Sequence, residues 1–286
     1  MTAEPNLRHL EVKADGVELS GEQLGDGPPI VLLHGLTATR WYVVLGSKLL
    51  ARHGFSLISY DARGHGESSA APSPEAYEYR DLVADLGAVL DDVDAEQVVL
   101  AGNSMGAHTA MAFALQFPER LAALVQIGPA YEGRPRERDD ELDSWRRLAD
   151  GLERGGVEGF MEAYTPSVPE RWRDTVCKVT RQRLERHRDL RALADAVRVV
   201  PGSLAFEGME ELEEMRVPTL VIGSRDEADP GHPLAIAQEY AERLPDAELL
   251  VEEEGKSPLA WQGAQLSRAI EDFLERRVPE WAKRRT

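Results

Sequence analysis

Gly102-Asn103-Ser104-Met105-Gly106 decides the fold of this 286-residue chain. The apolar run 97–101 before it is typical of a buried strand, and residues 105–117 after it predict a helix that stops near Pro118. A serine between two glycines at such a junction is typical of a sharp strand-to-helix turn, because flanking Cβ atoms would collide with the neighbouring backbone. The turn would raise the Ser104 hydroxyl above the sheet at a helix N-terminus, where unpaired N–H groups favour a developing negative charge.

Strands and helices alternate on either side of this turn. Residues 7–13 and 17–24 predict a hairpin about Asp15-Gly16, since an Asp-Gly pair is a strong turn signal. Short apolar runs predict further strands, and apolar residues spaced about 3.6 apart predict helices. The further strands are 29–33, 55–60, 121–127, 217–222 and 248–251, and the helices are 79–93, 233–244 and 259–275. The sequence therefore predicts a doubly wound α/β core with a mostly parallel sheet of about eight strands.

The middle of the chain has a different pattern. Residues 131–215 show helical spacing only, with breaks at Gly155-Gly156 and between Pro166 and Pro169. A block without strands adds nothing to a sheet. We therefore expect one core formed by residues 1–130 and 216–286, with residues 131–215 inserted as a helical cap, or lid.

Charge and composition limit the partners. The net charge of −18 disfavours nucleic acid and anionic membrane surfaces, which a basic face would be needed to bind. No apolar run approaches the roughly 20 residues that span a bilayer, and the first residues lack a basic and apolar targeting pattern. The single cysteine, Cys177, cannot form an internal disulfide. We expect a cytoplasmic protein that acts on a small molecule, and the sequence leaves its oligomeric state open.

The seven histidines show neither H-E-x-x-H nor another paired metal-ligand spacing, and no G-x-G-x-x-G joins a strand to a helix. We therefore expect no cofactor and no metal. His108, one turn beyond Ser104, is expected to pack against its neighbours, since its side chain points back over its own turn. His53 and His187, in charged surroundings, are expected to be solvated.

Four motifs together resemble the capped α/β-hydrolase-fold family, which includes serine esterases, lactonases and carbon–carbon bond hydrolases. They are His34-Gly35 after one strand, Asp61-Ala62-Arg63-Gly64-His65-Gly66-Glu67-Ser68 after the next, the turn at Ser104, and Gly223-Ser224-Arg225-Asp226 after a later strand. The resemblance extends over nearly the whole chain and implies an α/β-hydrolase fold with an inserted lid. It says less about the substrate, because this fold carries many chemistries.

The resemblance implies roles for individual residues. Ser104 matches the nucleophile and Asp226 the acid of a Ser-Asp-His triad, with Asp229 a nearby rival for the acid. The backbone N–H groups of Leu36 and Met105 are candidate oxyanion donors, so we assign these two residues to substrate binding. The turn residues His34 and Gly35 are assigned with them. In the 61–68 run, Arg63 and His65 are expected to shape the loop beside the oxyanion site rather than to catalyse.

The chain departs from the family at the last triad position. The family has a histidine between a glycine and a Ser-Pro step, and this chain has Gly255-Lys256-Ser257-Pro258. A lysine with an ordinary pKa near 10.4 is protonated at neutral pH, and bringing that pKa near 7 costs roughly 4 kcal/mol. Asp226 and the acidic run 252–254 would favour the ammonium form. We expect an Asp226–Lys256 ion pair, with Lys256 as a base only if it is desolvated.

His232 is the alternative base, because it lies in the loop after Asp226 and opens onto the same end of the sheet. Alternatively, His232 is an exposed residue that only leads into the helix that begins at residue 233.

Three hypotheses for function remain open. The first is a hydrolase of esters, lactones or related acyl compounds, with His232 or Lys256 moving the proton. The second is a non-hydrolytic lyase or isomerase that uses Lys256 electrostatically, and the third is a catalytically silent ligand-binding protein.

Overall fold

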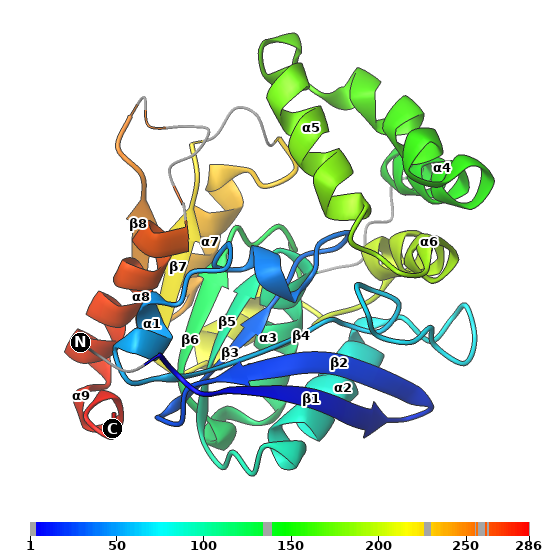
Figure 1. The fold of residues 1–286 in the computed structure, drawn as a ribbon. Coiled ribbons are helices and arrows are strands. Elements are labelled where there is room, and N and C mark those ends of the chain that lie inside the picture. The colour runs from blue at the N-terminus through cyan, green and yellow to red at the C-terminus, as the bar shows by residue number, and fades with distance from the viewer. Residues whose placement is uncertain are drawn as a thin grey trace.

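The fold is built on one central sheet, seen in the computed structural model, which describes residues 4–133, 139–225, 230–254, 256, 261 and 263–285. The sheet order is β1-β2-β4-β3-β5-β6-β7-β8 (Figure 1). The strands are β1 Leu7–Ala14, β2 Val17–Leu24, β3 Pro29–Leu33, β4 Ser56–Tyr60, β5 Val98–Asn103, β6 Leu121–Ile127, β7 Thr219–Gly223 and β8 Ala247–Val251. Only β1–β2 and β2–β4 are antiparallel, and every later pair is parallel. This confirms the predicted mostly parallel sheet.

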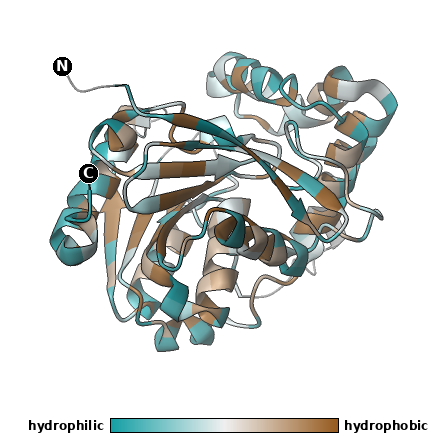
Figure 2. Ribbon diagram, turned by 60° about the horizontal axis from the view of Figure 1, so that its bottom comes forward, coloured by the Kyte–Doolittle hydropathy of each residue, from teal (hydrophilic) through white to brown (hydrophobic). Residues whose placement is uncertain are grey.

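Helices cover both faces of the sheet. The core helices are α1 Leu49–Arg52, α2 Tyr79–Asp92, α3 Met105–Gln116, α7 Leu234–Arg243, α8 Gly263–Arg277 and α9 Pro279–Ala282. Buried apolar residues of α2, α3 and α7 pack on one face, and those of α1, α8 and α9 pack on the other. In Figure 2 the hydrophobic colour lies mainly on the strands, between these two layers. The parallel strands β3 to β7 are thus buried on both faces, as their continuous apolar runs predict.

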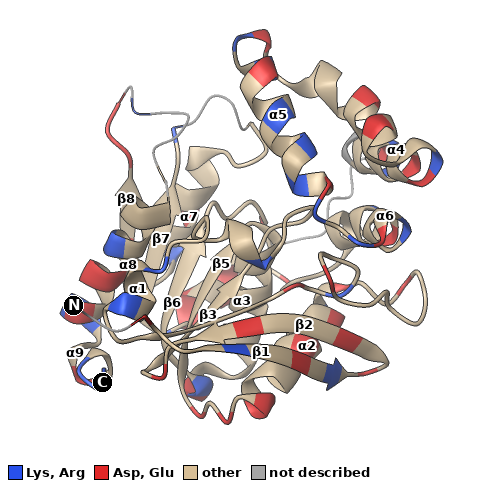
Figure 3. Cartoon of the chain, viewed as in Figure 1, with Lys and Arg blue, Asp and Glu red and all other residues tan. Residues whose placement is uncertain are grey.

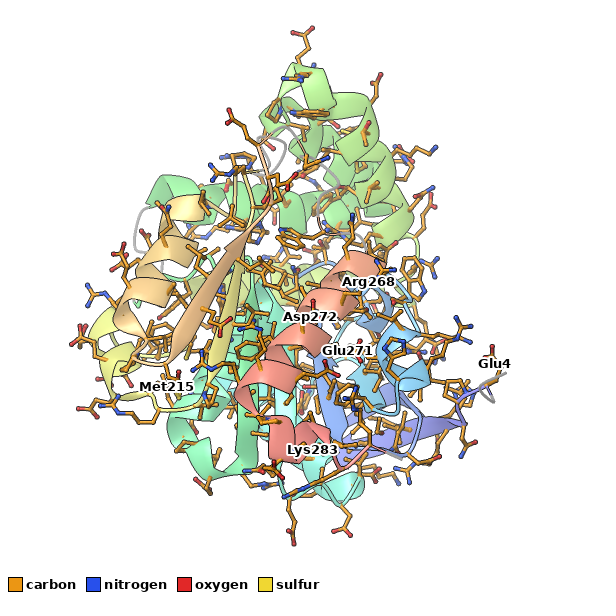
Figure 4. The ribbon with its side chains drawn as sticks, turned by 90° about the vertical axis from the view of Figure 1, so that its left-hand side faces the viewer. Glu4, Met215, Arg268, Glu271, Asp272 and Lys283 are labelled. Carbon is orange, nitrogen blue, oxygen red and sulfur yellow. The ribbon has the colours of Figure 1, made fainter. Side chains whose placement is uncertain are left out.

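The predicted hairpin between β1 and β2 is present. Asp15 and Gly16 adopt positive φ angles of 28° and 78°, as a tight two-residue turn requires. Helix α8 begins at Gly263, and the start predicted at residue 259 lies outside the described residues. Glu271 of α8, labelled in Figure 4, lies 2.7 Å from the ring of His53 at the end of α1, and His53 is exposed as expected.

The predicted cap, residues 131–215, contains helices and no strand in its described part. They are α4 Asp139–Tyr164, α5 Arg173–Leu184 and α6 Leu190–Val199, with 3₁₀ turns between them and after them. Gly156, at φ 60°, kinks α4 within the Gly155-Gly156 pair. The helices share an apolar cluster of their own, to which Leu152, Phe160 and Leu193 belong. In Figure 1 α4 and α5 stand above the carboxyl ends of the strands, and α6 lies nearer to the core.

This helical segment is joined to the rest of the fold through α6. Ala196 and Val200 pack with Tyr77, Leu82 and Met105 of the core in one buried cluster. Basic side chains occur along α5, whereas the segment after β8 is acidic (Figure 3). No described helix has both the length and the apolar character needed to cross a membrane.

Candidate active site

Ser104 occupies a strained turn between β5 and α3. Its φ and ψ angles are 51° and −115°, a region that non-glycine residues rarely adopt and that recurs at functional sites. A Cβ at Gly102 would lie 2.2 Å from Gly106 O, and a Cβ at Gly106 would lie 2.1 Å from Leu33 O. Glycine is therefore required on both sides, for the steric reason that the sequence suggests. The turn leaves Ser104 partly exposed while Met105 behind it is buried.

The loop after β3 lies directly beside Ser104. A Cβ at Gly35 would be 3.4 Å from Ser104 Cβ. The loop forms a four-residue turn in which Ala38 N–H donates to Gly35 O at 3.0 Å. This bond does not use the Leu36 N–H, and Met105 is the first residue of α3, so its N–H has no partner within the helix. The role of both N–H groups as oxyanion donors stays a prediction.

His34 supports this turn from beneath. It is 2 % exposed, its Nε2 accepts the Ala62 N–H at 2.9 Å, and its Nδ1 donates to Gly35 O at 2.9 Å. These two bonds fix the tautomer and use both ring nitrogens. The side chain of His34 therefore orients the backbone of the turn.

His232 reaches Ser104 from the loop after β7. Its Nε2 lies 2.8 Å from Ser104 Oγ, which is hydrogen-bond distance. The ring passes Gly128, at the end of β6, where an added Cβ would lie 3.5 Å from His232 Cδ2. Gly128 also has φ 54°, which favours glycine at this position. A Cβ there would be in ordinary van der Waals contact with the ring, so glycine is favoured at position 128 by its backbone conformation rather than by lack of space.

Lys256 is exposed, and its backbone N–H donates to Glu253 O at 3.2 Å. Asp226 and Asp229 lie outside the described residues, and so does the expected Asp226–Lys256 ion pair. The structure therefore brings Ser104 together with His232, and the acid stays a prediction.

Glu252 is a residue of the site region that sequence reasoning missed. The sequence places it in the acidic run 252–254, but it is only 7 % exposed. Its carboxylate accepts the Ser224 hydroxyl at 2.9 Å and the Arg225 N–H at 2.6 Å. It thus fixes the start of the loop that leads from β7 to His232. The sequence does contain a signal for this contact. Glu252 directly follows β8, the parallel neighbour of β7, so it begins at the same edge of the sheet as the loop after β7.

The 61–68 run forms the loop after β4, as the sequence predicts. Arg63 is 1 % exposed and makes two hydrogen bonds to Asp85 of α2, at 2.8 and 2.7 Å. Asp61 is equally buried and accepts the N–H groups of Arg40 and Glu67. The Arg63 charge is thus paired with Asp85, and the Asp61 charge is paired with the Arg40 guanidinium. A buried charge is tolerated in a protein core only when it is paired in this way.

Three buried histidines lie side by side under the candidate site. The ring centres of His34 and His65 are 5.0 Å apart, and those of His65 and His187 are 5.6 Å apart. The expectation that His187 is solvated is wrong, because it is 8 % exposed. It lies between α5 and α6, where the chain returns to the core. His108 packs as expected, and its Nε2 accepts the Ala130 N–H at 2.9 Å.

Burial keeps these three histidines neutral. Desolvation lowers the pKa of His34 to about 4 and the pKa values of His65 and His187 to about 3. Neighbouring positive charges act in the same direction, from Arg183 on both outer histidines and from Arg40 on His34. The charges that face the cluster are Arg40 of η1 (Arg40–Tyr42), Asp61 after β4, which partly offsets the shift of His187, and Arg183 of α5.

This cluster predicts acid-sensitive stability. Each group has a folded-state pKa below its unfolded value near 6.5, so below that pH the unfolded chain binds more protons. The free energy of unfolding should fall as the pH is lowered from 6.5 toward 4, by about 1.4 kcal/mol per pH unit for each proton taken up. Urea unfolding at pH 7, 6 and 5 measures how the free energy of unfolding changes with pH. Replacing His65 by glutamine should flatten this dependence, and an unchanged slope would contradict this explanation.

Comparison with known proteins identifies the family. Residues 28–199 match the alpha/beta hydrolase fold family. The chain belongs to this family. A putative 2-succinyl-6-hydroxy-2,4-cyclohexadiene-1-carboxylate synthase of Bacillus subtilis (strain 168) is 29% identical over 272 residues, which cover 91% of this chain and 96% of that protein. Epoxide hydrolase 2 of Siraitia grosvenorii is 34% identical over 122 residues, and the match spans 38% of that protein and 42% of this chain.

Solved structures of alpha/beta hydrolases share the fold. A thermophilic esterase from Thermogutta terrifontis superposes with a TM-score of 0.74 at 24% identity, covering 94% of this chain and 98% of that one. At this identity the likeness shows the fold alone. Within the described residues, no group of three or more histidine, cysteine, aspartate or glutamate side chains is placed to hold a metal ion.

Proposed function

We propose that this protein is a serine hydrolase that cleaves an ester, lactone or related acyl bond, with Ser104 as the nucleophile and His232 as the general base. The 2.8 Å contact between Ser104 Oγ and His232 Nε2 carries the proposal. A nucleophile within hydrogen-bond reach of an imidazole is the arrangement that activates a serine. The strained turn at Ser104 supports the same assignment, and so does the neighbouring loop 34–38 after β3, which we call the oxyanion loop.

The reaction follows from this geometry. Ser104 Oγ attacks the carbonyl carbon while His232 Nε2 takes its proton, and the carbonyl π electrons move onto oxygen. The N–H groups of Leu36 and Met105 stabilise that oxyanion. When the intermediate collapses, the bond to the leaving oxygen breaks and His232 returns the proton to it. Water then attacks the acyl-enzyme with His232 again as base, and releases the acid and free Ser104.

A carboxylate completes this proposal. We assign Asp226 to orient His232, with Asp229 as the rival, because both belong to the loop between β7 and His232. Such a carboxylate would stabilise the imidazolium that forms when Ser104 loses its proton. The proposed cap, residues 131–215, would provide the roof over the site.

Lys256 takes no proton in this proposal. Its exposure argues against the desolvation that a lysine base needs. The hypothesis of a non-hydrolytic lyase or isomerase has one observation in its favour, since a relative that matches nearly the whole chain is named a synthase. No described contact of Lys256 supports it, and the hypothesis of a silent binding protein gains no observation of its own. A ligand-binding protein would require neither the strained serine nor an imidazole in contact with it.

Labelling with a fluorophosphonate tests the proposal without knowledge of the substrate. Ser104 Oγ should attack phosphorus, the P–F bond should break with loss of fluoride, and His232 should accept the hydroxyl proton. Intact-mass measurement should show one adduct per chain, and peptide mapping should place it on Ser104. A folded sample that stays unmodified, or that carries the adduct on another residue, would refute the assignment.

A further inference from the structure

The oxyanion loop contains a strained residue that other parts of the chain must hold. Thr37 lies third in the turn closed by Gly35 and Ala38, and has φ 65°. A β-branched residue in this region is an outlier, with a cost of order 1–3 kcal/mol. The turn therefore does not keep its shape from local preferences alone. Thr37 directly follows Leu36, whose N–H is the proposed oxyanion donor.

The cap supplies the contact that holds Thr37. His187 Nε2 donates to Thr37 O at 3.0 Å, and His187 Nδ1 accepts the Gly66 N–H at 2.9 Å. Both bonds are buried, and together they fix one neutral tautomer. One cap side chain thus connects the oxyanion loop after β3 with the loop after β4.

Neighbouring contacts fix the same cap segment to the core. Arg188 N–H donates to Gly66 O at 2.9 Å, and the Arg186 guanidinium lies 5.2 Å from the ring centre of Trp41. The Leu36 side chain packs against the apolar cluster of the cap as well as against the core cluster that contains Met105. Cap and oxyanion loop therefore meet at both the backbone and the side chain of the turn.

We propose that His187 is a positioning residue through which the seated cap holds the Leu36 N–H in place for the oxyanion. The inference rests on the proposed function, because it assumes acyl transfer at Ser104. His187 itself does not touch the reacting atoms. Its loss should weaken binding of the transition state and leave binding of the ground state nearly unchanged, since the carbonyl oxygen gains full charge only in the transition state.

Two substitutions at position 187 separate this role from simple packing. In His187→Asn the side-chain oxygen can take the place of Nδ1 and keep the bond from Gly66 N–H, but the side chain is too short to reach Thr37 O. In His187→Gln the amide nitrogen can take the place of Nε2 and donate to Thr37 O. Arg186→Met is the matched control, since it removes the contact with Trp41 and leaves both His187 bonds intact.

The experiment measures two quantities in the native protein and in each variant. They are the rate of hydrolysis of a p-nitrophenyl ester and the affinity for an alkyl trifluoromethyl ketone, an inhibitor that forms an oxyanion when Ser104 adds to it. We expect His187→Asn to lower kcat by about 10- to 100-fold with KM within about twofold, since loss of a whole oxyanion donor costs about 10²–10³. Affinity for the ketone should fall in parallel with kcat/KM. His187→Gln should recover most of the activity, and Arg186→Met should stay within about threefold of the native enzyme.

Each contrary outcome has a distinct meaning. Three outcomes would overturn the positioning role: a kcat of His187→Asn equal to that of the native protein, a rise in KM alone, or equal losses of activity in the Asn and Gln variants. The proposed function would still stand in each case, because the native protein would still hydrolyse the ester. If the native protein showed neither turnover nor fluorophosphonate labelling, both the proposed function and the positioning role of His187 would be refuted. If His187→Asn fails to fold, the comparison of His187→Gln with the native protein still decides, because a 10-fold loss of ketone affinity in that folded variant would contradict the proposal.

Discussion

Replacing Ser104 by alanine is expected to lower kcat for ester hydrolysis by at least about 10⁴-fold. The hydroxyl is the only group lost, and the contact with His232 Nε2 at 2.8 Å is lost with it. Without the nucleophile, only the oxyanion donors and substrate binding would still assist an attack by water. Initial-rate measurements with a p-nitrophenyl ester give the ratio.

The fold of the Ser104→Ala variant should be retained, since Ser104 is partly exposed and its strained turn is fixed by Gly102 and Gly106. A thermal unfolding midpoint close to that of the native protein is the control. If the folded variant kept turnover within about tenfold of the native rate, the hydrolysis would proceed without a covalent serine step. A serine-independent mechanism of hydrolysis would then be favoured.

Replacing His232 by alanine is expected to lower kcat/KM by about 10²- to 10⁴-fold, the usual contribution of a positioned general base. The matched variant is Lys256→Ala, which alters the residue at the position where the resemblance places the histidine. Because Lys256 is exposed, its loss should change kcat/KM by less than about threefold. The pair of variants thus assigns the proton transfer to one loop or the other.

Added imidazole sharpens the His232 experiment. The alanine variant leaves space between Ser104 and Gly128 where the ring had been, so millimolar imidazole should restore part of the lost rate. It should not accelerate Ser104→Ala. A large loss of activity in Lys256→Ala together with a mild effect of His232→Ala would reverse the assignment.

The core fold could be predicted from the sequence because its signals are local. Buried parallel strands appear as short apolar runs such as 29–33, and the Asp15-Gly16 pair marks its own hairpin. The turn at Ser104 needs glycine for steric reasons that flanking residues reveal. The apolar runs, the Asp-Gly pair and the spacing of the two glycines about Ser104 are all visible locally in the sequence, although the atom that a Cβ at Gly106 would meet is the distant Leu33 O.

The site depends on contacts between distant segments, and there the sequence was less informative. His232 and Ser104 are 128 residues apart in the sequence and meet only through the fold, so the sequence alone left the exposed alternative open. His187 was expected in solvent because its neighbours are charged, but the chain turns back onto Gly66 at that point. Glu252 is buried for a similar reason, since it lies against the loop after β7.

The central claim is that His232, and not the residue at position 256, activates Ser104. The most direct measurement is the second-order rate constant for fluorophosphonate labelling of Ser104, compared among the native protein, His232→Ala and Lys256→Ala by intact mass. We predict a rate at least about 100-fold lower for His232→Ala and a near-native rate for Lys256→Ala. Equal labelling of the native protein and His232→Ala, with slow labelling of Lys256→Ala, would contradict the account.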